Sequence, residues 1–463
     1  MAKKKHEVAR AIRVILLLWA VILLGGQSIM VAQEKLPVPA WSKETKEQKN
    51  KRMEWWTHDR FGMFIHWGLY ALPARHEWVK HNEKMTNEQY QKYFDHFNPD
   101  LYQPKLWAAR AKAAGMKYVT ITTKHHEGFC LWDSKYTDYK STNTPCHRDL
   151  IKELVDACRA EGLRVGFYYS LIDWHHPDFP YDNLHPEAPK DSATRAEANK
   201  HRDLKKYQQY MKNQLAELLT NYGQIDELFL DFSYEKDQYK MWDAEGLLQV
   251  VRRLQPQIIV DDRLGLGDDN PWGWDYKTPE QYMPVEWPRV NGEQVPWETC
   301  QTFSGSWGYH RDEASWKSVP QLVVLLIETV SKGGNLLLNV GPTARGEFDY
   351  RANDRLDGIA EWMSRHNRAI YGCTQAPQQF QKPDKCLLTY NPETKRLYVH
   401  VLDWPCCGGL PLPGFKGKFK YAQLLNDASE VRFNEDKDKD LVNLSIPVQK
   451  PNVAVPVIEL FLE

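Results

Sequence analysis

The segment 61–68 reads FGMFIHWG, an apolar run rich in branched and aromatic side chains that ends near a histidine. Similar short runs return at 118–123, 165–170, 227–232, 258–262, 298–303 and 336–340. Stretches with apolar residues three and four apart have the period of amphipathic helices, at 148–160, 202–220, 246–254, 319–331 and 352–366. This alternation predicts a (β/α)8-like, TIM-type barrel in which strands 61–67 and 336–340 are neighbours. An eighth strand is ambiguous and is expected within 272–297.

The texture of the sequence changes after residue 372, where strand patterns continue without helical ones. Candidate strands are 386–390, 396–402, 421–425, 441–446 and 453–462, and residues 397–401 alternate with period two. We therefore expect a catalytic barrel at 55–372 and an antiparallel β-sandwich at 378–463. Residues 33–54 are expected to form an N-terminal linker.

The first 32 residues have the composition of an export signal. Basic residues at positions 3–5, 10 and 13 precede an apolar run at 14–24, and small residues follow up to Ala32. The apolar run is too short to span a bilayer stably. An uncleaved anchor is the alternative, because Met30 occupies a position where signal peptidases prefer a small residue. We expect export to the periplasm or the extracellular space, with no stable membrane insertion once the signal is removed.

The charge balance and the aromatic content indicate the class of partner. Lys plus Arg (60) nearly cancel Asp plus Glu (61), which argues against nucleic acid or an anionic membrane as a partner. Eighteen Trp and 23 Tyr favour carbohydrate, because flat amphipathic rings stack on sugar faces. The eight Cys show no CxxC spacing, and no HxxxH pattern occurs. We expect neither a metal nor a cofactor.

Reactive side chains follow the strand runs, which is where barrel enzymes carry their active sites. They are His66, His125 and His126, Tyr169, Asp231, and Arg263. A single histidine at a strand end is more often a core or capping residue, but three on adjacent strands offer partners for sugar hydroxyls. Asp231 is interpreted as a nucleophile, with a helix N-cap as the alternative. Arg263 could keep Asp231 ionised or bind a hydroxyl, and a plain salt bridge is the other reading.

A retaining glycosidase needs a second carboxyl group about 5 Å from the nucleophile. The segment after Arg263 supplies Glu280, Glu286, Glu293 and Glu298 among many aromatic residues. Most of these side chains must be solvated surface charges. Their spacing alone does not choose between them.

These residues stand in motifs that resemble the α-L-fucosidases of glycoside hydrolase family 29 from about residue 55 to 372. The motifs are FGMFIHWG at 61–68, Glu77-Trp78, KHHEGF at 124–129, YYS at 168–170, Asp262-Arg263, DYKTPE at 275–280, WETC at 297–300, SWGY at 306–309 and GGNLLLNVGP at 333–342.

The resemblance implies cleavage of terminal α-L-fucose from a fucosylated oligosaccharide or glycoconjugate, with retention, through a covalent glycosyl-enzyme and without a metal. Asp231 falls at the family nucleophile. The fucose pocket corresponds to His66, Glu77, Trp78, His125, His126, Tyr169 and Arg263. Glu280 is similar to the family acid/base, with Glu298 and Glu286 as alternatives.

One departure from the family pattern follows the nucleophile. The family usually places Gly after this Asp, whereas this chain has Phe232. The ring is expected to narrow or redirect the leaving-group side. Two other functions remain open: a carbohydrate-binding protein with impaired catalysis on the same fold, and a metal-dependent barrel hydrolase.

Overall fold

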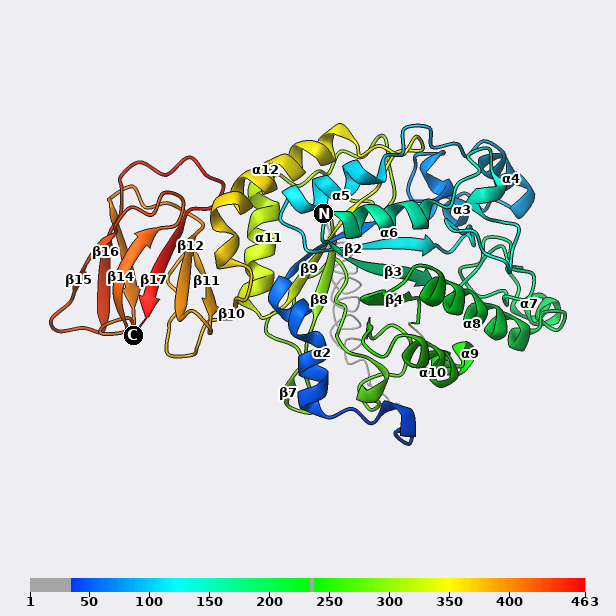
Figure 1. Ribbon diagram of the computed structural model, residues 1–463, viewed down its shortest axis with the longest axis horizontal. Helices are drawn as coiled ribbons and strands as arrows, with labels where there is room; N and C mark the ends of the chain where they lie inside the picture. The colour runs from blue at the N-terminus through cyan, green and yellow to red at the C-terminus, as the bar shows by residue number, and fades with distance from the viewer. Residues whose placement is uncertain (1–34, 234–236, 463) are drawn as a thin grey trace, which may run out of the picture.

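A computed structural model describes residues 35–233 and 237–462, and its larger part is a curled parallel sheet of seven strands (Figure 1). Their order across the sheet is β5-β4-β3-β2-β1-β9-β8, so the chain's first strand pairs with β9. The bounds are β1 Phe61–Ile65, β2 Tyr118–Lys124, β3 Arg164–Ser170, β4 Glu227–Asp231, β5 Ile259–Val260, β8 Glu298–Thr302 and β9 Asn335–Val340. The predicted strand runs and the predicted pairing of the first and last are confirmed.

An extended segment closes the gap between the two edges of the sheet. Tyr276 forms a parallel bridge with Asp261 after β5, and Lys277 and Glu280 form parallel bridges with Trp297 and Cys300 beside β8. This segment does not meet the definition of a full strand, yet it occupies the eighth position of the barrel. The predicted barrel fold is therefore confirmed, with its irregular eighth member inside the expected range.

Helices cover the outer face of the sheet. The main ones are α5 Pro104–Ala113, α6 Leu150–Ala160, α8 Leu204–Asn221, α10 Ala244–Leu254, α11 Val319–Ser331 and α12 Tyr350–His366. Shorter ones are α3 Val79–Asn82, α4 Asn87–Asp95, α7 Ser192–Asn199 and α9 Gln238–Trp242. Several begin at a side-chain cap: Ser318 forms a capping box with Gln321 at α11, and Asp149 accepts from Lys152 N at α6.

The inside of the barrel is filled by side chains from alternate strand positions. Phe64, Tyr168, Phe229, Tyr276 and Leu337 pack together there as one buried cluster. Because successive residues of a strand point to opposite faces, these positions determine which residues farther along each strand face the open end.

The structure corrects the prediction of a linker at 33–54 over the second half of this segment. Helix α2 (Lys46–Asp59) begins there with a capping box between Thr45 and Gln48. Arg52 of this helix forms an ion pair with the buried Asp275 at 2.7 Å and donates to Ile258 O. The helix is thus attached to the start of the eighth barrel segment, a contact between distant residues that local sequence does not reveal.

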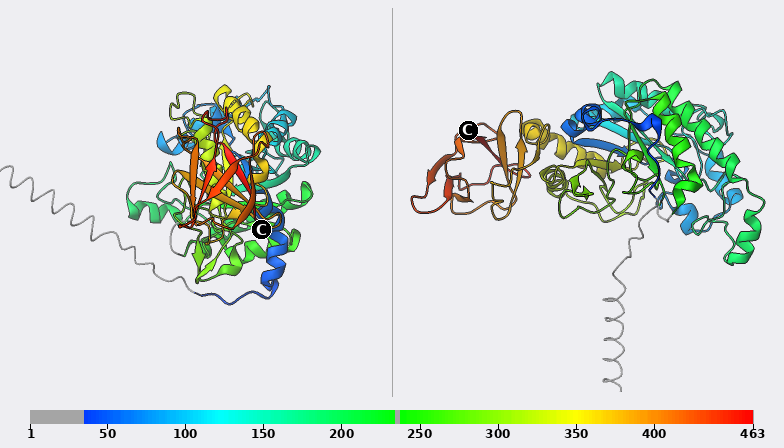
Figure 2. Two further views of the ribbon diagram at one scale, coloured as in Figure 1. Left: turned by 90° about the vertical axis from the view of Figure 1, so that its left-hand side faces the viewer. Right: turned by 90° about the horizontal axis from the view of Figure 1, so that it is seen from below.

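The C-terminal part is antiparallel, as expected, and lies beside α11 and α12 (Figures 1 and 2). One sheet has the order β10-β11-β12-β17-β14 and the other β13-β16-β15. The bounds are β10 Thr374–Gln375, β11 Cys386–Asn391, β12 Arg396–Val401, β13 Gly409–Pro413, β14 Phe419–Leu424, β15 Arg432–Glu435, β16 Leu441–Ser445 and β17 Val457–Leu462. A separate hairpin in the barrel part joins β6 Arg289–Val290 to β7 Glu293–Gln294.

Strands β10, β13 and β15 were not foreseen: β10 has only two residues, β15 is mostly exposed, and β13 contains two prolines, which argue against a strand in a sequence pattern. The indole nitrogen of Trp362 on α12 donates to Val455 O, which ties this part to the barrel. The predicted signal at 1–32 lies outside the described residues. Among the residues that are described, no helix is long and apolar enough to cross a membrane.

Candidate active site

A cavity opens at the carboxyl ends of the barrel strands. It encloses about 370 Å³, part of it open to solvent. Its lining residues are Phe64, His66, Trp78, His125, His126, Tyr168, Phe229, Asp231, Phe232, Arg263, Glu280, Cys300 and Trp307. Seven of the nine residues first assigned to the site therefore line it, although they are spread over more than 200 positions of sequence.

Asp231 is the last residue of β4 and faces this cavity. Its Oδ2 accepts a hydrogen bond from the Tyr168 hydroxyl at 2.7 Å, and its Oδ1 accepts one from Arg263 Nη1 at 2.8 Å. Both donors hold the carboxyl group in place at the cavity. An ionised carboxylate at this position can attack an electrophilic carbon in the cavity.

Glu280 lies on the other side of the same guanidinium group. Arg263 Nη1 donates to Glu280 Oε2 at 2.7 Å, so a single nitrogen contacts both carboxylates. Since that nitrogen is 2.8 Å from one oxygen and 2.7 Å from the other, the two oxygens are at most 5.5 Å apart. The side chain of Glu280 is 37% exposed, against 12% for Asp231. One carboxylate is thus enclosed and the other reaches toward solvent, where a leaving group would depart.

The three histidines form one wall of the cavity and are almost fully buried. The rings of His125 and His126 have centroids 4.0 Å apart, and His66 lies 5.7 Å from His125. Burial lowers the pKa of His66 and of His126 well below the usual histidine value, and neighbouring His125 lowers both further. The imidazoles of His66 and His126 therefore face the cavity in their neutral form near pH 7.

Comparison with known proteins places this site in a family. The family model described as "Alpha-L-fucosidase" matches residues 29–368. The chain belongs to the α-L-fucosidase family. Members of this family are glycoside hydrolases, in agreement with the carboxylate pair.

Several solved α-L-fucosidases share the fold over most of the chain. α-L-Fucosidase isoenzyme 1 from Paenibacillus thiaminolyticus is 46% identical, with a TM-score of 0.84 over 90% of this chain and 99% of that one. A family 29 α-L-fucosidase from Bacteroides thetaiotaomicron is 32% identical, with a TM-score of 0.78 over 89% and 96%. That structure is a covalent intermediate trapped with 2-fluoro-fucosyl fluoride in a Glu-to-Gln mutant. Human plasma α-L-fucosidase is 32% identical over 77% of each chain.

Aromatic rings complete the cavity of this α-L-fucosidase family member. Trp78 packs against His126 and Phe232 at 5.1 and 5.9 Å between centroids, and Trp307 lies 5.0 Å from His66. Trp307 was not selected from the sequence as a site residue. Its loop approaches closely because Gly341 has no side chain: a Cβ there would lie 2.6 Å from the Gly308 carbonyl carbon. The SWGY motif at 306–309 could be recognised in the sequence, but its close approach to Gly341 could not.

Phe232 has a left-handed backbone conformation, with φ of 96°. A side chain at such an angle costs roughly 1–3 kcal/mol. The family pattern, which usually has Gly here, avoids this cost. This left-handed conformation places the Phe232 ring beside Trp78 and His126 at the cavity wall.

The structure corrects the choice of Tyr169. Its hydroxyl donates to Gln214 on α8 at 2.8 Å, on the outer face of β3, while Tyr168 faces the cavity. Tyr168 is in register with Phe229, two residues before Asp231 on the neighbouring strand. Strand alternation counted from Asp231 would have selected Tyr168, but only if the register between the two strands were known.

Glu77 lies behind the cavity wall and not among the residues that line it. Its Oε2 accepts hydrogen bonds from Gly308 N at 2.9 Å and from the Ser306 hydroxyl at 3.3 Å. These are the two residues that flank Trp307. Glu77 therefore supports an aromatic wall of the site.

The two alternative acid/base residues lie outside the cavity. Glu298 is the first residue of β8, at the opposite end of the barrel, where the Tyr118 hydroxyl donates to it. Glu286 is exposed in the segment before β6. The structure therefore rules out both as partners of Asp231. Glu280 is the carboxylate that the fold brings to Asp231.

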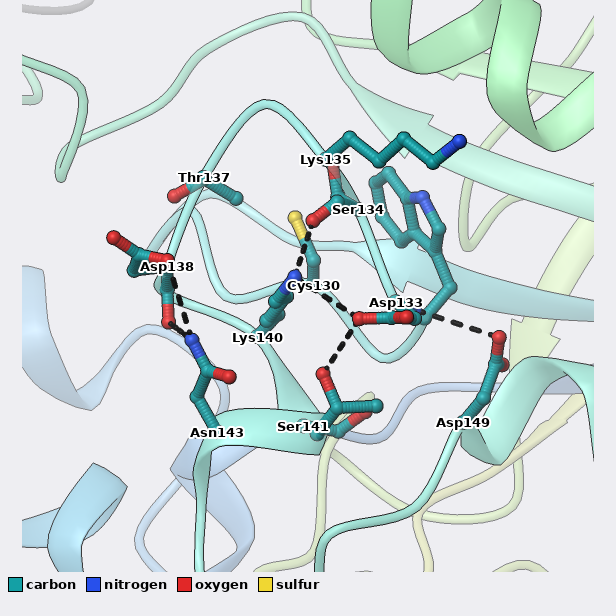
Figure 3. Close-up of polar contacts among 12 residues, drawn as sticks. Cys130, Asp133, Ser134, Lys135, Thr137, Asp138, Lys140, Ser141, Asn143 and Asp149 are labelled. Carbon is teal, nitrogen blue, oxygen red and sulfur yellow. Dashed lines mark hydrogen bonds and ion pairs between the residues drawn. The ribbon is translucent and has the colours of Figure 1, made fainter.

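The loop that follows His125 and His126 is fastened by its own polar contacts (Figure 3). Asp133 forms an ion pair with Lys140 at 2.9 Å, and Lys140 also donates to Ser134 O. Asn143 donates to Asp138 O at 3.0 Å. The loop is thus closed on itself, which restricts the motion of the segment that leaves the two histidines.

In residues 35–233 and 237–462, no three His, Cys, Asp or Glu side chains are grouped so that they could hold a metal ion. The expectation that the enzyme needs neither metal nor cofactor stays a prediction.

Proposed function

We propose that this protein hydrolyses terminal α-L-fucosidic linkages with retention of configuration, with Asp231 as nucleophile and Glu280 as acid/base. The observation that carries the proposal is the upper bound of 5.5 Å between an Asp231 oxygen and a Glu280 oxygen. Retaining glycosidases have their carboxyl groups about 5–5.5 Å apart, whereas inverting ones need about 6.5–9.5 Å to admit a water molecule.

In the first step, an Asp231 oxygen bonds to the anomeric carbon and the glycosidic C–O bond breaks. Protonated Glu280 gives its proton to the departing oxygen, so the leaving group departs as a neutral alcohol. In the second step, Glu280 takes a proton from water, the water oxygen bonds to the anomeric carbon, and the Asp231 carboxylate leaves. The trapped covalent intermediate of the Bacteroides relative supports this route.

Arg263 has two parts in this cycle. It stabilises the negative charge on Asp231 before attack and again when that carboxylate leaves. It also contacts Glu280, so the same guanidinium group holds both carboxyl groups at the cavity. The Arg263 Nε atom donates to the Thr278 hydroxyl at 3.0 Å, which holds the guanidinium group in place.

The cavity suits a neutral 6-deoxy sugar. Three imidazoles and Arg263 provide partners for hydroxyl groups, and the rings of Trp78, Phe232 and Trp307 provide apolar walls for a methyl group. A single terminal residue would occupy the cavity, with the rest of a fucosylated glycan outside.

The experiment that tests the proposal follows product anomers by proton NMR during hydrolysis of an aryl α-L-fucoside. We expect α-L-fucose to appear first and β-L-fucose to follow by mutarotation. Initial β-L-fucose would mean an inverting mechanism and overturn the role of Asp231. No turnover at all would favour a carbohydrate-binding protein that retains the fold without the reaction.

We also propose that the protein is exported, with residues 1–32 as its signal. The support is the sequence pattern alone. N-terminal sequencing of protein recovered outside the cytoplasm should begin near residue 33. Recovery of the intact N-terminus in a membrane fraction would indicate an uncleaved anchor.

A further inference from the structure

Two of the cavity histidines are linked through their inner nitrogens to backbone carbonyl groups. His66 Nδ1 lies 2.7 Å from Asn339 Oδ1, and Asn339 Nδ2 donates to Trp307 O at 2.7 Å. A carbonyl oxygen can only accept, so the Asn339 amide must turn its NH₂ group toward Trp307. Its oxygen then faces His66, and His66 must donate from Nδ1.

A second series of hydrogen bonds fixes the tautomer of His126 in the same way. His126 Nδ1 lies 2.7 Å from Ser170 Oγ, and the Ser170 hydroxyl donates to Ile172 O at 2.7 Å. The single hydroxyl proton is used in that second bond. Ser170 Oγ can therefore only accept from His126, which must carry its proton on Nδ1.

We propose that Asn339 and Ser170 are positioning residues that hold His66 and His126 in the Nδ1–H tautomer, so that both rings present an Nε2 lone pair to the cavity. The proposal rests on the proposed function, because the lone pairs would accept hydrogen bonds from hydroxyl groups of the bound sugar. The low pKa of both rings agrees with neutral imidazoles.

The tautomer matters most for His126, because its Nε2 lies 3.9 Å from Asp231 Oδ2. A proton on that nitrogen would point at the carboxylate, and a small movement would make a hydrogen bond to it. Such a bond would lower the nucleophilicity of Asp231. With the proton held on Nδ1 by Ser170, the nucleophile keeps its hydrogen bonds from Tyr168 and Arg263.

The Asn339 amide also supports a second wall of the same cavity. Its amide joins His66 to the backbone of Trp307, whose ring lies 5.0 Å from the His66 ring. Loss of the amide therefore releases both a hydroxyl acceptor and an aromatic wall. Among the described residues His125 has no such series of hydrogen bonds: its Nδ1 lies 3.4 Å from Glu127 Oε2 without hydrogen-bond alignment, so its tautomer is not fixed in this way.

The direct test is neutron diffraction from crystals of the deuterium-exchanged full-length chain at neutral pH. We expect deuterium on Nδ1 and none on Nε2 in both His66 and His126. Deuterium on Nε2 of either ring would overturn the proposal for that ring. This measurement does not depend on activity, so a failure of the proposed reaction would be recognised separately by the absence of fucoside hydrolysis.

A matched pair of variants at Ser170 tests the functional consequence. Ser170→Ala removes the acceptor for Nδ1–H, and we expect kcat/KM on an aryl α-L-fucoside to fall at least about tenfold, mainly through kcat, because His126 can then donate to Asp231. Ser170→Thr keeps the hydroxyl and should recover most of kcat. Wild-type kcat in Ser170→Ala would contradict a role for the tautomer.

Asn339→Ala provides the second arm, in case a change at Ser170 disturbs the end of β3. We expect KM to rise at least about tenfold with a smaller change in kcat, since His66 and Trp307 contact the sugar and not the nucleophile. Thermal unfolding of each variant serves as the control for folding. An unchanged KM in a folded Asn339→Ala protein would overturn its assignment as a positioning residue.

Discussion

The two ends of the barrel each hold a pair of carboxyl groups, and the strand β4 contributes one residue to each pair. At the mouth, Asp231 and Glu280 are joined by the positive charge of Arg263 Nη1. At the foot, Glu227 and Glu298 are almost fully buried, and no positively charged side chain forms an ion pair with either within the described ranges 35–233 and 237–462.

The foot pair is bound by hydrogen bonds to neutral groups and to each other. Tyr276 donates to Glu227 at 2.8 Å, Thr120 also donates to Glu227, and Tyr118 donates to Glu298. Burial raises the pKa of Glu298 well above its usual range, and the charge of Glu227 raises it further. Burial also raises the pKa of Glu227. The raised pKa keeps the Glu298 proton to higher pH than in a solvated glutamate, so that this proton can be donated to Glu227.

The surroundings of the two pairs determine which carboxyl groups can take part in a reaction. A pair joined by a guanidinium group beside an open cavity can be ionised and can exchange protons with substrate and water. A pair that shares a proton in a closed interior has no access to either. The space for the foot pair depends on Gly166 of β3, where a Cβ would lie 2.8 Å from Glu227 Oε2 and 2.3 Å from Thr120 Oγ1.

Asp231→Gly should break the mouth pair most severely. Without the nucleophile, we expect kcat on an aryl α-L-fucoside to fall by about three orders of magnitude or more. The melting temperature of the variant should stay within a few degrees of the wild-type value. Steady-state kinetics measures the loss, and added azide should restore part of the rate by replacing the carboxylate. A variant with near wild-type turnover would show that another residue attacks.

Glu280→Ala should have a large effect that depends on the leaving group. On substrates with poor leaving groups, such as fucosylated oligosaccharides, we expect a loss of about 10²–10⁴-fold, because the departing oxygen no longer receives a proton. On aryl fucosides with acidic phenols the first step should be much less affected. The matched control is Glu286→Ala, an exposed carboxylate outside the cavity, which should retain wild-type rates on both. A uniform loss for Glu280→Ala across leaving groups would contradict its role as acid.

Glu298→Gln should change how the free energy of unfolding depends on pH. The folded-state pKa of Glu298 lies above its unfolded value, so its stabilising contribution is complete below about pH 4.3 and is lost as pH rises through the folded value. Gln keeps a donor to Glu227 and does not titrate. The free energy of unfolding of the variant relative to wild type should increase by up to about 1.4 kcal/mol for each pH unit above 4.3 until the folded pKa is reached.

Urea unfolding of both proteins between pH 5 and 8 measures this difference. The carboxyl groups elsewhere titrate alike in both proteins and cancel. A difference that does not change with pH would mean that the buried pair carries no shared proton.

The same Glu298→Gln variant should have the smallest effect on catalysis. We expect kcat/KM to stay within about twofold of wild type, because Glu298 lies at the end of the barrel away from the cavity. Steady-state kinetics on the poor leaving-group substrate is the strict test, since an acid/base residue would show its effect there. A loss comparable with that of Glu280→Ala would reverse the assignment of the two residues.

Most of the barrel could be predicted from sequence, because buried parallel strands and amphipathic helices have different periods. The strand ends also identified Asp231, Arg263 and the three histidines. Residue spacing alone did not choose between Glu280 and Glu298, since the choice depends on the irregular segment 275–280 that closes the barrel through isolated bridges, and only the family resemblance favoured Glu280. Tyr168 and Trp307 were missed because strand register and loop packing are properties of distant residues.

The central claim is that Asp231 forms the covalent bond to the sugar. Incubation with 2-fluoro-fucosyl fluoride, followed by proteolysis and mass spectrometry of the labelled peptide, tests it most directly. We predict one fluorofucosyl group per chain, attached to Asp231, and no labelling of Asp231→Gly. Stable labelling of another side chain would contradict the account.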